Sequence, residues 1–271
     1  MSLPLKLQVR NFAREQALRM LSALHGRADV SVPHVQFLYF HHVFEDEIPQ
    51  LRKLLQRLSH QYTFLGYSEA VGRISTGAID KPYLCFSSDD GFKNNLNAIE
   101  VFKEFGVSCC YFICPGFIGE SDYDRSAEIS RSVFHLPPVE FLNWADVERL
   151  QACGHEIGNH SFAHHRLSTL PEHELEADIM RAHESLEKHC GKMKHFAYPY
   201  GGAHDITDKA VDLIFNLDYI SCATAIRGAY VTAVDGQSSR ELIKRDPVIF
   251  FKNDHVAYFT GQNIKAAAAA I

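Results

Sequence analysis

Short apolar runs of the kind that form β-strands alternate with helical patterns along most of this chain. The candidate strands are residues 35–40, 83–87, 109–115, 155–160, 195–199, 219–224 and 247–251. A strand followed by a helix, repeated along a chain, gives parallel strands with helices packed outside them. We therefore predict an α/β fold, either a barrel or an open sheet. In both, functional groups gather at the carboxyl ends of the strands.

Three of the intervening helices have recognisable ends. The longest is predicted over residues 171–190, because a proline suits its first turn and a glycine follows its last residue. Asn143 can cap a second helix, which carries Asp146 three positions later. A third pattern of apolar residues near helical spacing ends at Gly106, which can serve as a C-cap.

The composition excludes several classes of protein. Of the 271 residues, 46% are hydrophobic and 22% are charged, so a sizeable core is available and disorder is not indicated. No apolar run approaches the roughly 20 residues that cross a bilayer. A formal charge of −6 and the lack of a Lys/Arg stripe argue against a nucleic-acid partner. The seven cysteines form no pair of CxxC motifs, and we interpret them as small buried hydrophobic residues in a reducing compartment.

The N-terminal residues lack the apolar segment and cleavage site of a secretory signal, so we expect a cytoplasmic protein unless a leader has been removed. Residues 11–25 form an amphipathic pattern with several arginines. Such a helix can lie on an anionic membrane surface or pack on its own domain. We therefore keep a peripheral membrane contact as one of two alternatives for this segment. We expect residues 1–30 to form an N-terminal amphipathic helical segment and 31–271 a single catalytic domain.

Two adjacent carboxylates, Asp89 and Asp90, follow the predicted strand 83–87 in the sequence "CFSSDDGF". Like charges repel, and the alternation of side chains along a strand would send one of the two toward the core. An unpaired carboxylate is costly to bury there. A solvated turn at Gly91 is one explanation. A bound cation is the other, because its charge would offset both carboxylates.

A second polar cluster, "GHEIGNHSFAHHRLS", follows another predicted strand. His160 and His164 are four residues apart, which on a helical turn places both imidazoles on one face within reach of a single ion. The neighbouring His165 would point elsewhere, to the surface or to a position behind the ligands. A third strand ends in "HFAYPYGG", a tight turn whose backbone N–H groups can be aimed into a pocket.

Together the three clusters describe one chemistry. A carboxylate and two histidines form a three-ligand set for a divalent ion such as Zn²⁺ and leave a position open for water. The second carboxylate can then accept the proton of that water as it attacks a carbonyl group. Backbone N–H groups of the "YPYGG" turn can stabilise the resulting oxyanion.

Three segments, "SSDDGF", "HSFAH" and "FAYPYG", in this order, resemble the core motifs of the polysaccharide deacetylases, the NodB-homology or carbohydrate esterase family 4 group. The likeness covers roughly residues 35–205. It implies a distorted (β/α) barrel and metal-dependent hydrolysis of N-acetyl or O-acetyl groups on sugars. The motif positions imply the following roles: Asp89 as catalytic base, Asp90, His160 and His164 as metal ligands, and the backbone N–H of Tyr200 in the oxyanion hole.

The sequence departs from the family pattern in two places. Many members orient the base with an arginine from the third motif, and here the matching position is Ala197. The Leu-x-His motif, whose histidine protonates the leaving amine, is also missing near the C-terminus. Some branches place that motif before the others, and "LYFHHV" resembles this arrangement. His41 is then the candidate general acid, with His255 as a rival and a non-catalytic, packed His41 as the alternative.

The resemblance thus implies a metal-dependent carbohydrate deacetylase that acts on an N-acetylated sugar or polysaccharide. We expect its divalent ion to be Zn²⁺. Two alternatives stay open: a metal-dependent hydrolase of another non-peptide C–N bond, such as a cyclic amide or ureide, and a carbohydrate-binding protein that has lost activity. With no visible leader, we expect a nucleotide- or lipid-linked sugar as substrate. Residues 119–141 have no strong pattern, and we expect them to cover the sugar site.

Overall fold

The computed structural model describes residues 16–17, 20, 30–234, 240, 242–248 and 253–269, and only the backbone of 253–260. Apart from residues 16, 17 and 20, the helix predicted over 11–25 lies outside the described residues. Within the described ranges, no helix combines the length and the apolar character needed to span a bilayer.

The elements alternate as the sequence pattern predicts. In chain order they are β1 (His34–Phe40), η1 (Glu45–Glu47), α2 (Ile48–Ser59), β2 (Thr63–Leu65), α3 (Tyr67–Thr76), β3 (Pro82–Ser88), η2 (Lys93–Ala98), α4 (Ile99–Phe105), β4 (Cys109–Ile113), α5 (Tyr123–Ser132), α6 (Trp144–Ala152), β5 (Glu156–Asn159), η3 (Leu167–Thr169), α7 (Glu172–Cys190), β6 (His195–Ala197), α8 (Asp208–Asn216), β7 (Ser221–Ala223), β8 (Leu242–Ile243), β9 (Asp246–Pro247) and α9 (Asn253–Ala269).

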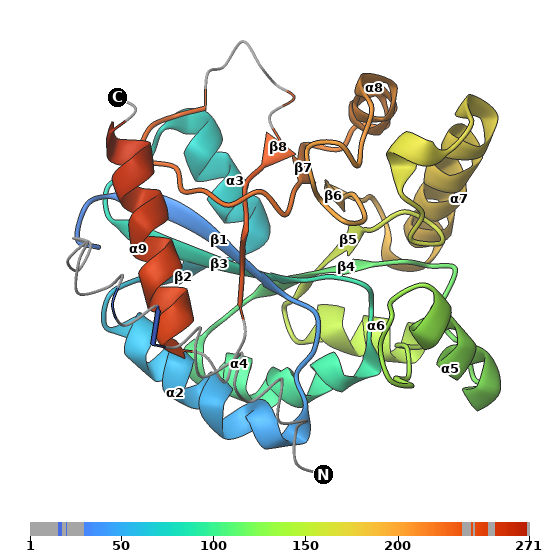
Figure 1. Ribbon diagram of the computed structural model, residues 1–271, viewed down its shortest axis with the longest axis horizontal. Helices are drawn as coiled ribbons and strands as arrows, with labels where there is room; N and C mark the ends of the chain where they lie inside the picture. The colour runs from blue at the N-terminus through green and yellow to red at the C-terminus, as the bar shows by residue number, and fades with distance from the viewer. Residues whose placement is uncertain are drawn as a thin grey trace.

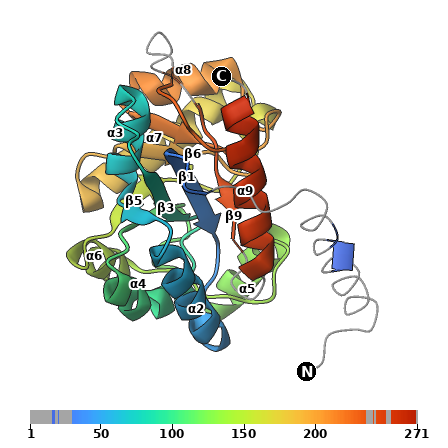
Figure 2. The same cartoon turned by 90° about the vertical axis from the view of Figure 1, so that its left-hand side faces the viewer.

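The strands form one parallel sheet in the order β8-β7-β6-β5-β4-β3-β1-β9, and β2 also pairs with β3. This sheet curls into a distorted barrel with the helices around its outside (Figure 1). Figure 2 shows α9 lying along the side of the barrel formed by β1 and β9. The predicted α/β architecture is therefore confirmed, in its barrel form.

A single short segment joins the two ends of the sheet. β8 pairs with β7 and β9 pairs with β1, and only Lys244 and Arg245 lie between β8 and β9. The backbone N–H of Val248 continues the pairing with β1 by donating to the carbonyl of Tyr39 at 2.7 Å. Because Ile243 packs inside the barrel, the period of two along a strand also places the side chain of Arg245 inside.

Strand β3 shows how the sequence divides the core. Tyr83 and Cys85 belong to the apolar cluster inside the barrel, whereas Leu84 and Phe86 belong to the larger cluster between the sheet and the outer helices. The same alternation carries on past the end of the strand. It sends the side chain of Asp89 into the barrel. This is the buried position that the sequence analysis expected for one of the two carboxylates, and an unpaired charge is costly there.

The predicted ends of the helices agree with the structure, whereas several strands are shorter than predicted. Asn143 caps α6, with its side chain accepting from the backbone N–H of Asp146 at 2.9 Å. Gly106 ends α4 in the left-handed conformation, with φ of 66°. The strand predicted at 247–251 is described only as β9, because residues 249–251 lie outside the described residues.

A polar network ties the amino ends of β5 and β6 to α3. The carboxylate of Glu156 accepts a hydrogen bond from the backbone N–H of Ser68 at 3.0 Å and a second, shorter one from its hydroxyl. His195 contacts the same hydroxyl at 2.8 Å and, on its other side, the hydroxyl of Ser221 at 2.9 Å. Burial raises the pKa of Glu156, but hydrogen bonds from His195 and Ser68 outweigh it, so that the pKa falls to about 2.

Replacing Glu156 by glutamine is expected to lower the free energy of unfolding by roughly 1.5–3 kcal/mol at neutral pH, because a largely buried, charge-assisted network loses its negative charge and one of its two acceptor oxygens. The folded pKa lies below the ordinary value of 4.5. The stabilisation is therefore present above about pH 4.5 and is lost as the pH falls toward about 2. Urea unfolding of both proteins across this range checks the sign. Glu104→Gln, in an exposed ion pair with Arg52, is the matched control and should change stability little.

Candidate active site

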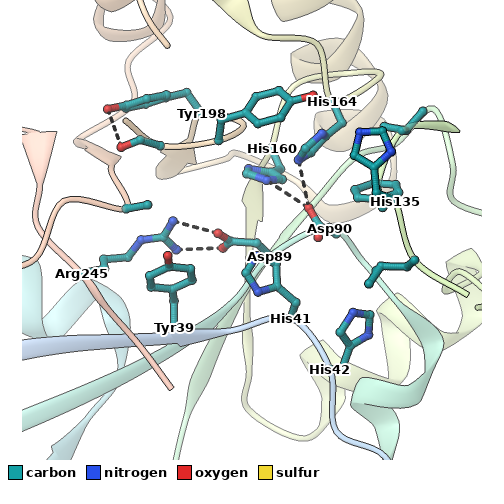
Figure 3. A pocket seen from close by; sticks show the side chains of 16 residues that line it. Tyr39, His41, His42, Asp89, Asp90, His135, His160, His164, Tyr198 and Arg245 are labelled. Carbon is teal, nitrogen blue, oxygen red and sulfur yellow. Dashed lines mark hydrogen bonds and ion pairs between the residues drawn. The ribbon is translucent and has the colours of Figure 1, made fainter. Parts of the chain in front are cut away.

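A pocket of about 290 Å³ opens at the carboxyl ends of the strands (Figure 3). It lies where the sequence places its three polar clusters, after β3, β5 and β6. The residues that line it are Tyr39, His41, His42, Asp89, Asp90, Val133, Phe134, His135, Leu136, His160, His164, Tyr198, Tyr200, Gly201, Ala225 and Arg245. All six site residues predicted from the sequence are therefore brought together in one cavity.

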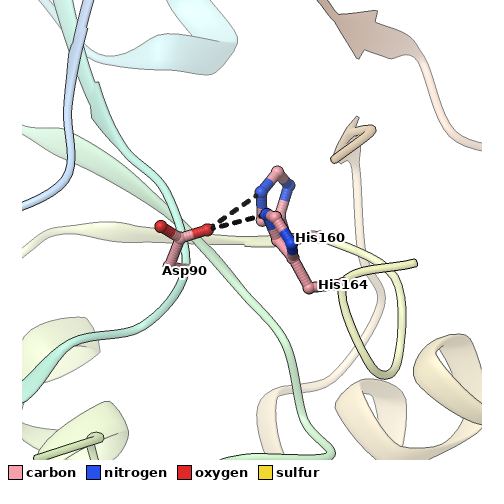
Figure 4. A group of neighbouring side chains, drawn as sticks. All are labelled: Asp90, His160 and His164. Carbon is pink, nitrogen blue, oxygen red and sulfur yellow. Dashed lines mark ion pairs between the residues drawn. The ribbon is translucent and has the colours of Figure 1, made fainter. Parts of the chain in front are cut away.

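Asp90, His160 and His164 form a buried group at the centre of the pocket (Figure 4). The Nε2 atoms of the two histidines each lie 3.3 Å from Oδ1 of Asp90. Ligands bound tetrahedrally about 2.0–2.1 Å from one Zn²⁺ lie roughly 3.3–3.4 Å apart. The spacing of the three donor atoms is thus that of a ligand set.

The hydrogen bonds around these three residues also fit a cation. The Nδ1 atom of His160 contacts the carbonyl oxygen of Ala197 at 2.6 Å, and because a carbonyl can only accept, Nδ1 carries the proton. In the neutral form that binds a metal ion, the Nε2 atom of His160 then presents a lone pair to Asp90. Oδ1 of Asp90 is buried and has no hydrogen-bond partner among the described residues. Lone pairs that face one another in a buried site require a positive charge between them.

The loop that carries the two histidines differs from the predicted helical turn. Residues 160–164 are not helical, and both Ser161 and His164 have positive φ, of 63° and 56°. The left-handed conformation, not a 3.6-residue period, brings the two imidazoles together. Asp178 of α7 fastens the loop, since its carboxylate accepts from the loop backbone at 2.9 Å and contacts Nδ1 of His165 at 3.2 Å. His165 is exposed, so of the two positions expected for it the structure shows the surface one.

Asp89 is held by an arginine that the sequence analysis missed. Nη1 and Nη2 of Arg245 donate to the two carboxylate oxygens of Asp89, both at 2.8 Å (Figure 3). The guanidinium also donates to the carbonyl of Thr224 and the hydroxyl of Ser87, and it lies 4.6 Å from the ring of Tyr39. Burial raises the pKa of Asp89, but the charge of Arg245, the nearby His160 and the hydrogen bonds from Arg245 together outweigh burial, so the pKa lies below its ordinary range. Asp89 is thus an oriented, ionised carboxylate.

Arg245 supplies the group that Ala197 cannot. It comes from the segment between β8 and β9, separated from Asp89 by 156 residues. In the sequence "LIKRDPVIFF" a charged triplet interrupts two apolar runs, and this interruption was the available signal. The sequence did not tell which of Lys244, Arg245 and Asp246 points into the barrel.

Two histidines follow β1 at the edge of the pocket, in different surroundings. His41 is exposed, and neither of its ring nitrogens has a hydrogen-bond partner among the described residues. His42 stacks on Phe92 at 4.4 Å, and burial lowers its pKa to about 4, so that it is neutral at pH 7. His255, the rival of His41 for the role of general acid, lies in α9 at a position where only the backbone is described.

The turn after β6 presents a backbone N–H to the pocket region. Tyr200 and Gly201 both have positive φ, of 65° and 69°. Residue 201 must be glycine, because an added Cβ would lie 2.4 Å from the backbone nitrogen of Ala225. Within the described part of the chain, the N–H of Tyr200 donates to no other group. It is therefore available to an oxyanion, as the motif implies.

The segment predicted to cover the sugar site does contribute a wall of the pocket. Residues 133–136, which follow α5, all line the cavity. The ring of Phe134 lies 4.7 Å from the ring of His164 and packs on Phe92 at 5.0 Å. The wall is largely apolar, and His135 interrupts it.

Comparisons with known proteins agree with this site. A family model described as polysaccharide deacetylase matches residues 76–217, just over half of the chain. A chitooligosaccharide deacetylase of Sinorhizobium fredii is 27% identical over 139 residues, which are 51% of this chain and 54% of that protein. One of Azorhizobium caulinodans is 43% identical over 53 residues, 19% of this chain and 25% of the relative. The chain thus spans about half or less of the length of these curated relatives.

Solved structures share the fold. IcaB from Ammonifex degensii superposes with a TM-score of 0.65 at 19% identity and covers 84% of this chain and 97% of its own. The Streptococcus pyogenes deacetylase PplD, solved in complex with acetate, gives 0.62 at 15% identity and covers 83% of this chain and 95% of its own. At these identities the likeness establishes the common barrel.

Proposed function

Since this chain belongs to the polysaccharide deacetylase family, we propose that it is a metal-dependent hydrolase that removes the acetyl group from an N-acetylated sugar. One observation carries the proposal: the Asp89 carboxylate, oriented by Arg245, faces the same pocket as the Asp90, His160 and His164 ligand set. A protein that only bound carbohydrate would have no need for a buried, bidentate pair behind an ionised carboxylate.

Asp90, His160 and His164 would hold the divalent ion, for which Zn²⁺ suits the nitrogen and oxygen donors best. When bound, the ion supplies Lewis acidity, polarising a carbonyl group and making water more acidic. Asp89 accepts the proton of the attacking water, and Arg245 keeps the carboxylate ionised until it does so. The N–H of Tyr200 donates to the oxyanion that forms at the acyl carbon.

Direct measurement of acetate tests this function. The purified protein, loaded with Zn²⁺, is incubated with N-acetylglucosamine oligosaccharides, and released acetate and free amine are quantified. We expect equal amounts of both products, and their loss on treatment with a chelator. Hydrolysis of cyclic amides or ureides assayed in parallel, with no acetate from the oligosaccharides, would instead favour hydrolysis of another C–N bond. No product from any substrate would favour a carbohydrate-binding protein.

His41→Ala is expected to lower amide hydrolysis by about 10² to 10⁴ and to leave the metal content unchanged. An amine leaves poorly unless it is protonated, and histidine is the side chain that most often donates a proton in catalysis. His41 is exposed at the pocket edge with both ring nitrogens free of described partners, so it can reach a substrate.

An activated aryl acetate ester separates this role from pocket damage. Its leaving group needs little protonation, so its hydrolysis by His41→Ala should fall much less than that of the amide. Equal losses on amide and ester would assign His41 to positioning, and no loss on either would make His255 the next candidate.

A further inference from the structure

An aromatic stack connects the pocket to the protein surface. Phe92, which is fully buried, lies 4.4 Å from His42 with the rings inclined by 22°, and Phe44 covers the other face of His42 at 5.3 Å and 19°. His42 lines the pocket, whereas Phe44 is the outermost ring and is 45% exposed. The pocket lining therefore continues outward as an aromatic surface.

Phe44 is one of three exposed apolar side chains in the loops that build this pocket. Tyr200 is 48% exposed and Ile226 is 39% exposed. The three lie in the loops after β1, β6 and β7, and the same loops contribute His42, Tyr200 and Ala225 to the pocket. Single exposed apolar side chains are ordinary, but several on the loops that form one pocket are a surface against which a ligand can pack.

We propose that Phe44 is a stacking platform for a second sugar unit, next to the one whose acetyl group enters the pocket. The inference rests on the proposed deacetylase function and names its substrate class: an amino-sugar oligosaccharide of two or more units. A pyranose ring carries C–H groups on its faces and hydroxyl groups on its rim. A flat aromatic ring can bury such a face and leave the hydroxyls in water.

The stack makes this platform rigid before a ligand arrives. Phe44 rests on His42, which rests on buried Phe92, and Nδ1 of His42 also contacts the side-chain amide of Asn94 at 3.4 Å. A side chain that is already held in place loses little conformational entropy on binding, so more of the burial energy appears as affinity.

The charges beside Phe44 select the kind of oligosaccharide. Helix η1 follows it directly with the carboxylates of Glu45, Asp46 and Glu47. These negative charges repel the phosphates of nucleotide- or phospholipid-linked sugars. They accept neutral sugars and attract the ammonium group of an amino sugar that has already lost its acetyl group. The platform therefore fits a neutral or partly deacetylated chain better than the phosphate-linked sugar expected from the sequence.

Dependence of the reaction on chain length tests the proposal. The wild-type protein and Phe44→Ala, both loaded with Zn²⁺, are assayed on N-acetylglucosamine, on its β-1,4-linked oligomers up to the tetramer, and on an aryl acetate. For the wild type we expect kcat/KM to rise with length. Phe44→Ala should lose about tenfold on the oligomers and little on the monomer or the ester. Phe44→Tyr should keep the gain, and Tyr123→Ala, an exposed aromatic residue outside the pocket lining, should behave as wild type.

Binding measurements on the same variants separate this proposal from the function on which it rests. If the wild type releases no acetate from any substrate, the proposed function fails, and titration calorimetry with the tetramer still decides the platform: weaker binding by Phe44→Ala supports it and equal binding overturns it. If the wild type does release acetate, the proposed function stands. In that case, a fall in kcat/KM of Phe44→Ala that is equal at every chain length, or no fall at any length, overturns the platform proposal. A wild type that neither releases acetate nor binds the tetramer overturns both.

Discussion

His164→Ala and His160→Ala should each abolish metal binding and acetate release. Each change leaves two of the three donor atoms that meet at Asp90, and among the described residues these three form the group that can hold a metal ion. Altering only a partner of a metal ligand costs about 10–100-fold in affinity, so removing a ligand should cost more. Loss of a Lewis acid worth several kcal/mol corresponds to a fall in rate of about 10³-fold or more.

Metal content by elemental analysis, measured after dialysis, is the primary readout, and circular dichroism confirms that each variant is folded. His165→Ala is the matched control. It removes the adjacent imidazole of the same loop, which contacts Asp178 and not Asp90, so the protein should keep its metal. Full metal occupancy in both the His160 and the His164 variant would refute the ligand assignment.

Local patterns in the sequence were enough to predict the α/β fold and the gathering of the site, and the family resemblance implied the barrel form. The alternation of strand and helix signals is a property of neighbouring residues, and the carboxyl ends of parallel strands meet at one end of the fold whatever the loops contain. Asp89, Asp90 and His160 each follow a buried strand directly, so their meeting required no knowledge of the loops.

The conformation of the histidine loop could not be predicted in this way. A spacing of four residues suggests a helical turn, but Ser161 and His164 adopt left-handed backbone conformations that a period does not reveal. These conformations are stabilised by a contact from α7, where Asp178 accepts the loop hydrogen bonds. Such a contact depends on tertiary packing and leaves no signal in the loop itself.

Arg245 could not be predicted for a related reason. It acts on Asp89 across 156 residues, and its direction depends on where the segment between β8 and β9 enters the sheet. A shift of one residue would point Asp246 into the barrel instead. In the structure, Asp246 faces the other side and accepts from Gln36 and from Asn263 of α9. The absent arginine of the third motif would favour an inactive protein only if no other group oriented Asp89, and the placement of Arg245 removes that argument.

Asp89→Asn is expected to keep the metal and to lose about 10² to 10⁴ in turnover, because an amide cannot accept the proton of the attacking water. The variant also leaves Arg245 buried without a counter-charge. Breaking a buried ion pair by removing one partner costs about 3–5 kcal/mol of stability, so the assay has to be made well below the melting temperature of the variant. Metal content and melting temperature are measured together with turnover.

Arg245→Met separates the chemical role of Asp89 from its structural one. It breaks the same buried pair, and therefore brings a similar loss of stability, but it leaves the carboxylate in place as an acceptor for the proton. If Asp89 is the base, turnover should fall less in Arg245→Met than in Asp89→Asn, because a badly oriented base still accepts protons and an amide does not. Equal turnover in the two variants would mean that the pair matters only as a structural unit. Turnover near that of the wild type in Asp89→Asn would exclude Asp89 as the base, and the proton acceptor would then have to be sought among the other groups that line the pocket.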